Sequence, residues 1–449
     1  MKYKVAFETL GCRLNQSETA SLHRGFLQKG FEIVEDTAAA DLCVINTCSL
    51  TSQATSKCRR KVRSILRKNP DVCVATVGCY AQTDVEALRN IGGVDYIVGT
   101  ADKLRLPEIV ASPVKLPEAV VVRERTVKER FSVPGAGYYP FHTRANLKIQ
   151  EGCDFVCSYC IIPRSRGPAR SRDFDDVVRE ACDLVSFGHR ELILTGINMG
   201  TYWDGGRGLA DLVEALSNLE GLERIRLSSI EPTTVEGTLI DMMAEGQKLC
   251  PYFHIPAQSG DDEVLLRMRR KYRVSEYVAF IRDIIKRVPN VGLGTDIMVG
   301  FPGESESAFQ RSCELVEEIP FTHIHVFSFS ARRRTAAYSI KEKVPAREIT
   351  RRSAAMHDIA DKKKQAYYEA QQARTLNVLF EERESNGLFV GFSGNYVKVG
   401  VDTPLDLSNR LATVRISRIE QAAPKSSILA VGEMIEVESH SSGVKRGCG

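Results

Sequence analysis

Segments with strand-like and helix-like patterns alternate along most of this chain of 449 residues, and the alternation limits the folds open to it. Strands that alternate with helices form parallel sheets, because each helix carries the chain back to the edge where the previous strand began. Residues 1–115 are therefore predicted to be an α/β domain with a mostly parallel sheet. Its strands are expected at 4–9, 42–47, 73–78 and 96–99, and its helices at 15–29, 52–68 and 83–89.

The alternation stops in a stretch rich in Pro, Gly and charge at 112–140, which we interpret as a linker or extended crossover, and then starts again. Residues 139–370 hold six strand–helix units, which suggest an open, six-stranded relative of the (βα) barrel. Its strands are expected at 147–150, 192–197, 224–230, 252–256, 294–299 and 323–329, and a long polar helix at 347–373. Residues 371–441 are predicted to form a small closed β-barrel, with strands at 376–381, 388–401, 412–419 and 435–438.

Composition restricts the possible partners only weakly. Hydrophobic residues make up 43% and charged residues 26%, as in ordinary globular proteins. No apolar run approaches the ~18 residues of a membrane span, and Glu8 comes too early for a signal peptide, so the chain is predicted to be a cytoplasmic protein without membrane contact. The net charge of +4 does not indicate nucleic-acid binding by itself. Without an export signal, 13 cysteines favour metal binding or catalysis over a disulfide framework.

Three cysteines form a C-x3-C-x2-C cluster directly after the first predicted strand of the barrel. They are Cys153, Cys157 and Cys160, named here the barrel triad. A tetrahedral zinc site needs four ligands, and no fourth Cys or His lies close by in the sequence. Thiolates also hold iron–sulfur clusters, and three thiolates on a four-iron cluster would leave one iron open. Zinc is therefore the weaker of the two alternatives.

Three further cysteines follow consecutive strands of the N-terminal domain. Cys12, Cys48 and Cys79, named here the N-terminal triad, come at or just after the ends of the strands at 4–9, 42–47 and 73–78. Because the carboxyl ends of parallel strands meet at one edge of a sheet, these thiols are expected to converge at a ligand-binding crevice. The alternative is three unrelated buried cysteines, since free Cys packs well in protein cores.

The barrel triad, with Tyr159 before its last cysteine, resembles the signature of radical S-adenosylmethionine enzymes. The segments 161–167 and 171–172 are similar to the methylthiotransferase branch of that family, as are the sequences around the N-terminal triad. The resemblance implies two 4Fe–4S clusters, one on each triad, and S-adenosylmethionine bound at the barrel cluster. It also implies that the barrel cluster generates a radical on the target carbon, while the N-terminal cluster delivers the methylated sulfur. An electron donor such as a flavodoxin or ferredoxin and a source of sulfur would be needed.

Small and polar residues at the ends of the barrel strands are expected to face this cofactor. With Tyr159, the predicted cofactor-binding residues are Thr195, Gly196, Asn198, Ser229, Glu231, Gln258 and Gly300. Each motif is weak alone, but their position at successive strand ends is hard to explain without a ligand. His254, at the end of the fourth strand, is interpreted as a hydrogen-bonded barrel histidine rather than a metal ligand.

Several basic runs are candidates for contact with RNA phosphates. The segment 57–68 holds seven cations and no acid, and Arg59, Arg60 and Arg63 are predicted to contact RNA; Cys58 within it is expected to be exposed or half-buried. Further basic residues are those at 267–273 and 332–334 and Arg164, Arg166, Arg170 and Arg172. The C-terminal module resembles the RNA-binding TRAM domain, but residues 371–440 carry a net charge of −2. Binding there would therefore use a local face with Tyr396, Lys398, Arg410 and Arg415. Any single run is also consistent with a solvated surface.

The combined features predict an enzyme that adds a methylthio group to a large substrate. The segments 10–19 and 226–232 are most similar to the subgroup that modifies N6-threonylcarbamoyladenosine at position 37 of tRNA, next to the anticodon. The subgroups acting on isopentenyladenosine in tRNA and on an aspartate of a ribosomal protein share the architecture and stay open. A distant alternative is a zinc-dependent RNA-binding protein without catalysis.

Overall fold

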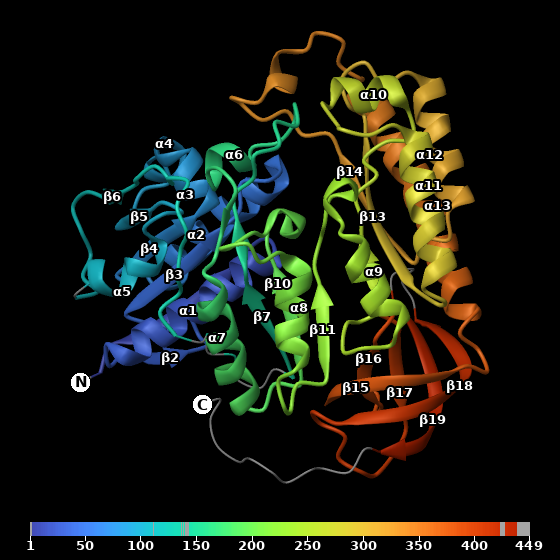
Figure 1. Ribbon diagram of the computed structural model, residues 1–449. Helices are drawn as coiled ribbons and strands as arrows, with labels where there is room; N and C mark the ends of the chain where they lie inside the picture. The colour runs from blue at the N-terminus through green and yellow to red at the C-terminus, as the bar shows by residue number, and fades with distance from the viewer. Residues whose placement is uncertain are drawn as a thin grey trace.

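The computed structural model describes residues 2–110, 112–135, 137, 139, 143–422 and 427–437. An N-terminal α/β domain, a (βα) barrel and a C-terminal β-barrel follow one another along the chain and lie against each other (Figure 1). Pro140, Glu438 and Cys448 lie outside the described residues, as does the end of the predicted C-terminal module after residue 437. None of the described helices is long and apolar enough to cross a membrane.

The N-terminal domain is built on a six-stranded parallel sheet with the order β2-β1-β3-β4-β5-β6. The strands are β1 (Lys4–Thr9), β2 (Glu32–Val34), β3 (Leu42–Thr47), β4 (Cys73–Gly78), β5 (Tyr96–Val98) and β6 (Val120–Val122). The helices are α1 (Arg13–Gln28), α2 (Ser52–Lys68), α3 (Cys79–Thr83), α4 (Val85–Arg89) and α5 (Leu106–Ile109), with a 3₁₀ turn η1 (Lys103–Arg105). The parallel sheet confirms the predicted fold class. The edge strands β2 and β6 were not expected, because three half-exposed residues carry no clear pattern, and β6 lies within the segment interpreted as a linker.

Each face of this sheet carries its own apolar core. Along β3, Cys43 and Ile45 pack with Val62 and Ile65 of α2 on one face, while Val44 packs with α1 on the other. The side chains of a strand alternate between faces, which explains how one short strand serves both cores. Cys58 of α2 is 0% exposed and packs in the first of these cores, so the expectation of an exposed or half-buried thiol was wrong.

The barrel is open and six-stranded, as predicted. Its strands are β7 (Arg144–Lys148), β10 (Glu191–Thr195), β11 (Arg224–Leu227), β12 (Tyr252–His254), β13 (Gly292–Val299) and β14 (His323–Ser328). They form two parallel three-stranded halves, β11-β10-β7 and β12-β13-β14, which meet through a bridge between Ser229 and His254. Several strands end earlier than predicted, at Thr195, Leu227 and His254, because the next residues leave the ladder and form the loops of the site.

Helices and short elements surround these strands. The helices are α6 (Ile162–Ser165), α7 (Phe174–Ser186), α8 (Leu209–Ser217), α9 (Gly237–Ala244), α10 (Asp262–Arg267), α11 (Val274–Arg287), α12 (Glu306–Glu318) and α13 (Ala346–Glu369). The short elements are the hairpin β8 (Gln150–Glu151) with β9 (Arg170–Ser171) and the 3₁₀ turns η2 (Met199–Thr201), η3 (Pro232–Thr234) and η4 (Ala336–Ser339). The largest apolar core lies between these helices and the strands.

The C-terminal module is a closed five-stranded barrel, which confirms the prediction. Its order is β15 (Thr375–Arg383), β16 (Phe389–Ser393), β17 (Lys398–Val401), β19 (Ser427–Val437) and β18 (Leu411–Ala422). The predicted run 388–401 is two strands, broken by a turn in which Tyr396 has a φ of 71°. This turn docks onto the amino end of the (βα) barrel: Tyr396 stacks on Tyr252 and accepts a hydrogen bond from Arg13. Tyr396 is therefore occupied by contacts within the protein and not on an RNA-facing surface.

Candidate active site between two cysteine triads

The barrel triad lies on the loop between β8 and α6, and its three thiols are partly buried. Gln150 ties this loop to the end of β10. Its Nε2 donates to the carbonyl oxygens of Glu151 and Gly152 (3.1 and 2.9 Å), and its Oε1 accepts two backbone N–H groups of the β10 loop (2.8 and 3.1 Å). Gly152 has a φ of +70°, and a Cβ there would lie 1.9 Å from the carbonyl oxygen of Pro168. The loop therefore requires glycine immediately before Cys153.

The thiols of the barrel triad suit a bound metal group larger than one zinc ion. Burial raises the pKa of Cys153 to about 11 and that of Cys160 to about 12. Such thiols lose their protons when they coordinate a cation. One tetrahedral zinc ion needs its sulfur ligands about 3.8 Å apart. Among the described residues, neither triad forms a group whose ligand atoms all lie within 4.8 Å of one another. The wider spacing fits an iron–sulfur cluster.

Asn198 offers a free hydrogen-bond donor next to the barrel triad. Its Oδ1 accepts from the hydroxyl of Thr234 (3.0 Å) and from the N–H of Glu231 (3.4 Å). Its Nδ2 is buried and has no partner among the described residues. Leaving a buried donor unpaired costs roughly 1–3 kcal/mol, so this amide is suited to donate to a ligand such as the carboxylate of S-adenosylmethionine.

The other predicted cofactor residues differ in how they are placed. Thr195 is buried at the end of β10, and Gln258 is buried in the loop after β12, where it forms a bridge with Ile297 of β13. Gly196 and Ser229, which follow β10 and β11, are half-buried. Gly300 is directed elsewhere: a Cβ there would meet Ile349 of α13, and its N–H donates to Glu304. The structure therefore gathers most of the predicted residues around one face and gives Gly300 a packing contact with α13.

Arg270 is a residue of this site that sequence analysis assigned to a basic surface run. Its side chain is only 2% exposed, and it forms a bidentate ion pair with Glu231. Its Nη1 also lies 3.5 Å from the sulfur of Cys157 and 3.4 Å from the hydroxyl of Tyr159. Burial raises the pKa of Glu231 although Arg270 opposes the shift. Arg270 thus links the cofactor face to the barrel triad, and no local sequence signal distinguishes it from its exposed neighbours.

The N-terminal triad converges at one edge of the sheet. Cys12 follows β1, Cys48 follows β3 and Cys79 begins α3 after β4. Burial raises the pKa of Cys48 to about 12, and the thiols of Cys79, Cys12 and Cys58 add to the shift, which places these sulfurs near one another. A Cβ on Gly11 (φ +112°) would lie 2.9 Å from the Cβ of Cys48, so glycine is needed for this close approach.

A buried network of charges fills the space between the two triads. Its members are Lys103, Lys148, Arg166, Arg170, Glu18 and Glu151. Arg166 is 0% exposed and donates to Glu18 of α1 (2.8 Å) and to Glu151 (2.7 Å), which precedes the barrel triad. Burial opposes the ionisation of Glu18, but Arg166, Lys103 and Lys148 hold its pKa well below the ordinary value. The network therefore binds the two domains together through charge.

This network also carries an excess of positive charge close to the N-terminal triad. Four cations face two carboxylates. Against the effect of burial, negative charge on Cys79 raises the pKa of Arg166, so the two side chains are electrostatic neighbours. An anionic group held by the N-terminal triad would be stabilised at this position.

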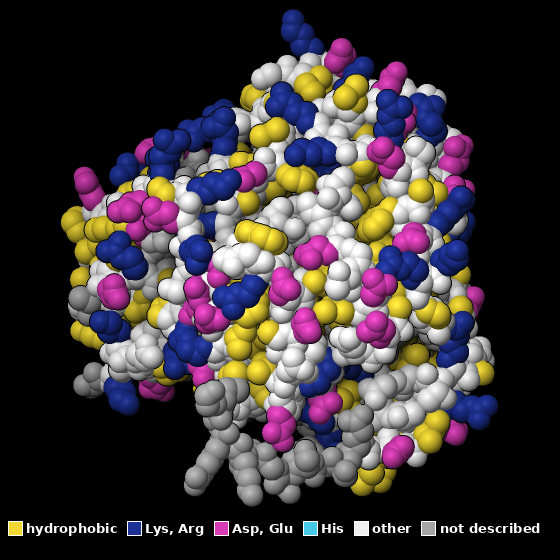
Figure 2. Space-filling model, in the orientation of Figure 1, with side chains coloured by type: hydrophobic (Ala, Val, Ile, Leu, Met, Phe, Trp, Pro, Cys, Tyr) yellow, Lys and Arg dark blue, Asp and Glu magenta, His cyan; other side chains and the backbone are white. Residues whose placement is uncertain are grey.

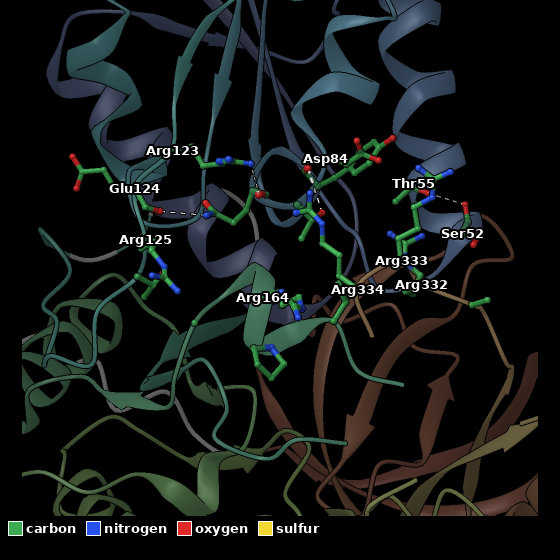
Figure 3. Close-up of a pocket in the computed structure, with 18 of the residues that line it drawn as sticks. Ser52, Thr55, Asp84, Arg123, Glu124, Arg125, Arg164, Arg332, Arg333 and Arg334 are labelled. Carbon is green, nitrogen blue, oxygen red and sulfur yellow. Dashed lines mark hydrogen bonds between the residues drawn. The ribbon is translucent and has the colours of Figure 1, made fainter. Parts of the chain in front are cut away.

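The two triads are brought side by side by one helix contact. Helix α6, which begins two residues after Cys160, packs against α3, which begins with Cys79. A cleft of about 700 Å³ opens beside this contact. Arginines from four parts of the chain line it: Arg59, Arg123, Arg125, Arg164, Arg332, Arg333 and Arg334. Figure 3 labels all of these except Arg59. Lys and Arg side chains are also frequent on the upper part of the face in Figure 2.

The predicted RNA-contacting residues are distributed unevenly around this cleft. Arg59 lines it and donates to the hydroxyl of Tyr80 (2.8 Å), while Arg60 and Arg63 are exposed on α2 but do not line it. Lys398 pairs with a carboxylate of the same module, and Arg415 is exposed. Of the arginines after the barrel triad, only Arg164 is exposed and lines the cleft. Arg166, Arg170 and Arg172 are paired with buried carboxylates instead.

Two segments of the chain match known protein families. Residues 147–316 match the Radical SAM superfamily, and residues 4–99 match Uncharacterized protein family UPF0004. Among solved structures, the chain is similar to the radical S-adenosylmethionine methyltransferase TsrM from Kitasatospora setae, with a TM-score of 0.53 and 14% identity over 73% of this chain and 75% of that one. At this level of identity the likeness concerns the fold.

Curated relatives are similar over nearly the whole chain. The threonylcarbamoyladenosine tRNA methylthiotransferase MtaB of Bacillus subtilis is 34% identical, over 92% of this chain and 93% of its own length. The protein of the same name from Aquifex aeolicus is 37% identical, over 84% and 93%. The tRNA-2-methylthio-N(6)-dimethylallyladenosine synthase of Jannaschia sp. is 33% identical, over 93% and 92%.

Proposed function

Because the chain belongs to the methylthiotransferase family of radical S-adenosylmethionine enzymes, we propose that it converts N6-threonylcarbamoyladenosine at position 37 of tRNA into its 2-methylthio derivative. The observation that supports the proposal is the packing of α6, which begins two residues after Cys160, on α3, which begins with Cys79. A reaction that activates a carbon at one cofactor and receives sulfur from another requires this proximity.

The residues around the triads would hold the two cofactors in these roles. When bound, two 4Fe–4S clusters and S-adenosylmethionine would supply the radical and the sulfur that an unactivated carbon needs. Each triad would ligate one cluster with its three thiolates. Asn198 would donate its free Nδ2 to the cofactor, and Arg270 would fix the carboxylate of Glu231 beside it. The buried charges around Arg166 would exclude water from the space between the domains.

The arginine-lined cleft supports RNA, and in particular a threonylcarbamoyl base, as the substrate. Seven arginines offer donors to phosphates and to the carboxylate of a threonyl group. An apolar dimethylallyl group would gain little from such a lining, although relatives with that activity are similar to the chain. The division into residues 1–115, 139–370 and 371–441 would give a sulfur domain, a radical domain and a small RNA-contacting domain that uses Arg415. The enzyme would act in the cytoplasm with an electron donor of the flavodoxin or ferredoxin class and a separate source of sulfur.

The proposal is tested with anaerobically purified protein and with tRNA. Iron and sulfide analysis should give two four-iron clusters per chain. Mass spectrometry of tRNA nucleosides from a deletion strain should show that 2-methylthio-N6-threonylcarbamoyladenosine is absent while its precursor accumulates. If the 2-methylthio derivative of dimethylallyladenosine were lost instead, the substrate would be dimethylallyladenosine in tRNA. Unchanged tRNA in the deletion strain would contradict both.

A further inference from the structure

A second group of metal-ligating side chains lies inside the barrel and contains none of the triad cysteines. His254 ends β12, Asp296 lies in β13 and His325 lies in β14, three neighbouring strands in which Asp296 and His325 are direct partners. Among the described residues, this is the only group of three His, Cys, Asp or Glu residues whose ligand atoms all lie within 4.8 Å of one another. It is named here the barrel-interior group.

The side chains of this group point to the inner face of the barrel. Thr295 precedes Asp296, and its hydroxyl lies 3.3 Å from the hydroxyl of Tyr277 on the outer helix α11. Successive residues of a strand point to opposite faces, so Asp296 points inward. His254 and Asp296 are mostly buried, whereas the side chain of His325 is 49% exposed. Two of the groups are thus fixed by burial, and the third borders an accessible space.

The distances within the group match those between ligands of one metal ion. The Nε2 of His254 lies 3.0 Å from the Oδ1 of Asp296, and the Nδ1 of His325 lies 3.3 Å from the same oxygen. In a tetrahedral zinc site with bonds near 2.0–2.1 Å, neighbouring ligand atoms are about 3.3 Å apart. The ligand nitrogens of the two imidazoles lie within 4.8 Å of each other, so all three ligand atoms are close enough to converge on one ion.

Two neighbours orient the imidazoles as the partners of metal ligands do. The Nε2 of His323 lies 2.7 Å from the Nε2 of His325, which leaves the Nδ1 of His325 directed at Asp296. Metal-bound histidines almost always donate their second ring N–H to an acceptor, usually a carboxylate, a backbone carbonyl or water, and here a ring nitrogen of His323 would take that role. Gly294 lies beside His254, and a Cβ there would come within 2.7 Å of its Nδ1. Because residue 294 is a glycine, there is room for the imidazole ring of His254 in this position.

We propose that His254, Asp296 and His325 form a third metal site, for a borderline divalent cation such as Zn²⁺ or Fe²⁺. Two imidazoles and one carboxylate favour these ions, whereas Mg²⁺ and Ca²⁺ prefer oxygen ligands. Three protein ligands leave a coordination position open on the exposed side of His325 for water or another small ligand. The site shares no ligand with the cysteine triads. It would also join β12, β13 and β14 across the barrel.

The test is the zinc content of the holoenzyme after equilibration with Zn²⁺ and dialysis, with both iron–sulfur clusters assembled so that the triad thiols are occupied. Wild type should keep one zinc ion per chain. His325→Ala and Asp296→Asn should lose it with no change in iron content. His323→Ala should weaken binding about 10- to 100-fold, because it removes the partner of a ligand.

His357→Ala is the matched control, since His357 is an exposed histidine on α13 outside the group. It should bind zinc as wild type does. Asp296→Asn preserves the shape of the side chain, and the half-exposed His325 tolerates truncation, so at least one of these variants should fold. The proposal would be overturned if wild type bound no zinc, or if the variants of His325 and Asp296 bound as much zinc as wild type. The three side chains would then be only a hydrogen-bonded group.

Discussion

Replacing Arg166 with Met should uncouple the cleavage of S-adenosylmethionine from the formation of the methylthio product. Arg166 is fully buried, and its guanidinium reaches Glu18 and Asn15 of the N-terminal domain as well as Glu151 of the barrel. Met fills a similar volume without charge or donors, so the variant removes these bonds and leaves little empty space. We expect the domains to stay folded but to lose their fixed relative position.

The cost can be worked out from the network. Breaking a buried ion pair usually costs about 3–5 kcal/mol, because a charge is left without a partner. Lys103, Lys148 and Arg170 still face the two carboxylates in Arg166→Met, so the loss should be near the lower end, about 3 kcal/mol. The pKa of Glu151 shows that the network as a whole favours its ionised form. Burial would raise this pKa, but Lys148, Lys103 and Arg166 together lower it from 4.5 to about 2.

The same shift gives the sign of the pH dependence. The folded-state pKa of Glu151 lies below its unfolded value, so its contribution to stability is fully present above about pH 4.5 and is lost as the pH falls toward 2. Urea unfolding at several pH values should therefore show a smaller loss of stability between pH 6 and pH 3 in Arg166→Met than in wild type.

The functional assay is the ratio of methylthio product to 5′-deoxyadenosine under reducing conditions. Cleavage of S-adenosylmethionine should persist in Arg166→Met, because the side chain of Arg166 bonds to Glu18, Asn15 and Glu151 and not to a thiol of the barrel triad or a predicted cofactor-binding residue. The ratio should fall by up to about a hundredfold, the effect of a displacement near 1 Å between reacting groups. Arg352→Met is the matched control: Arg352 is 5% exposed and binds the buried Glu304, away from the domain contact. An unchanged ratio in Arg166→Met, or an equal fall in Arg352→Met, would refute the reasoning.

Three further predictions address the triads and the cleft. Replacing the N-terminal triad with Ala should halve the iron content and abolish the methylthio product, while 5′-deoxyadenosine still forms. Replacing the barrel triad should abolish both the methylthio product and 5′-deoxyadenosine. If the first variant also lost both products, the N-terminal triad would have a structural role only. Gly152→Ala should remove the barrel cluster, because its Cβ would lie 1.9 Å from a carbonyl oxygen, whereas Gly237→Ala, in open space, should keep full iron content. Converting Arg59, Arg60 and Arg63 to Gln should weaken tRNA binding and reduce the slope of log K against log salt concentration by roughly 0.7–0.9 per lost phosphate contact. Equal slopes for the variant and wild type would indicate that this face of α2 is only a solvated surface.

Periodicity in the sequence was enough to predict the interior of each domain. The strands at 4–9, 42–47 and 73–78 and the helix α2 at 52–68 match their predicted limits, because their apolar residues face cores built within the same domain. The edge strand β6 was missed because its three residues are exposed or half-buried and carry no clear pattern. The two triads were found because their thiols follow strand ends, a position that any parallel sheet turns into a shared edge.

What the sequence could not predict is the contact between domains, and this changes the interpretation of its basic residues. A run such as Arg164 to Arg172 looks like a surface patch, since charge is rarely buried unless it is paired. The partners of Arg166 are Glu18, 148 positions away in the chain, and Glu151, so no local pattern could reveal the pairing. Arg270 is hidden in the same way by Glu231.

Cations that are paired inside the protein cannot contact RNA, and this reduces the number of basic residues that could bind the substrate. Arg166, Arg172 and Arg270 are each neutralised by buried or half-buried carboxylates. Arg164 and the run 332–334 line the cleft instead, and no ion pair joins them among the residues that the structure describes. Phosphate contacts and a base carboxylate would then compete for these few side chains, of which Arg332 lies near Cys48. The affinity for RNA should consequently depend more on the cleft arginines than on the total basic charge of the chain.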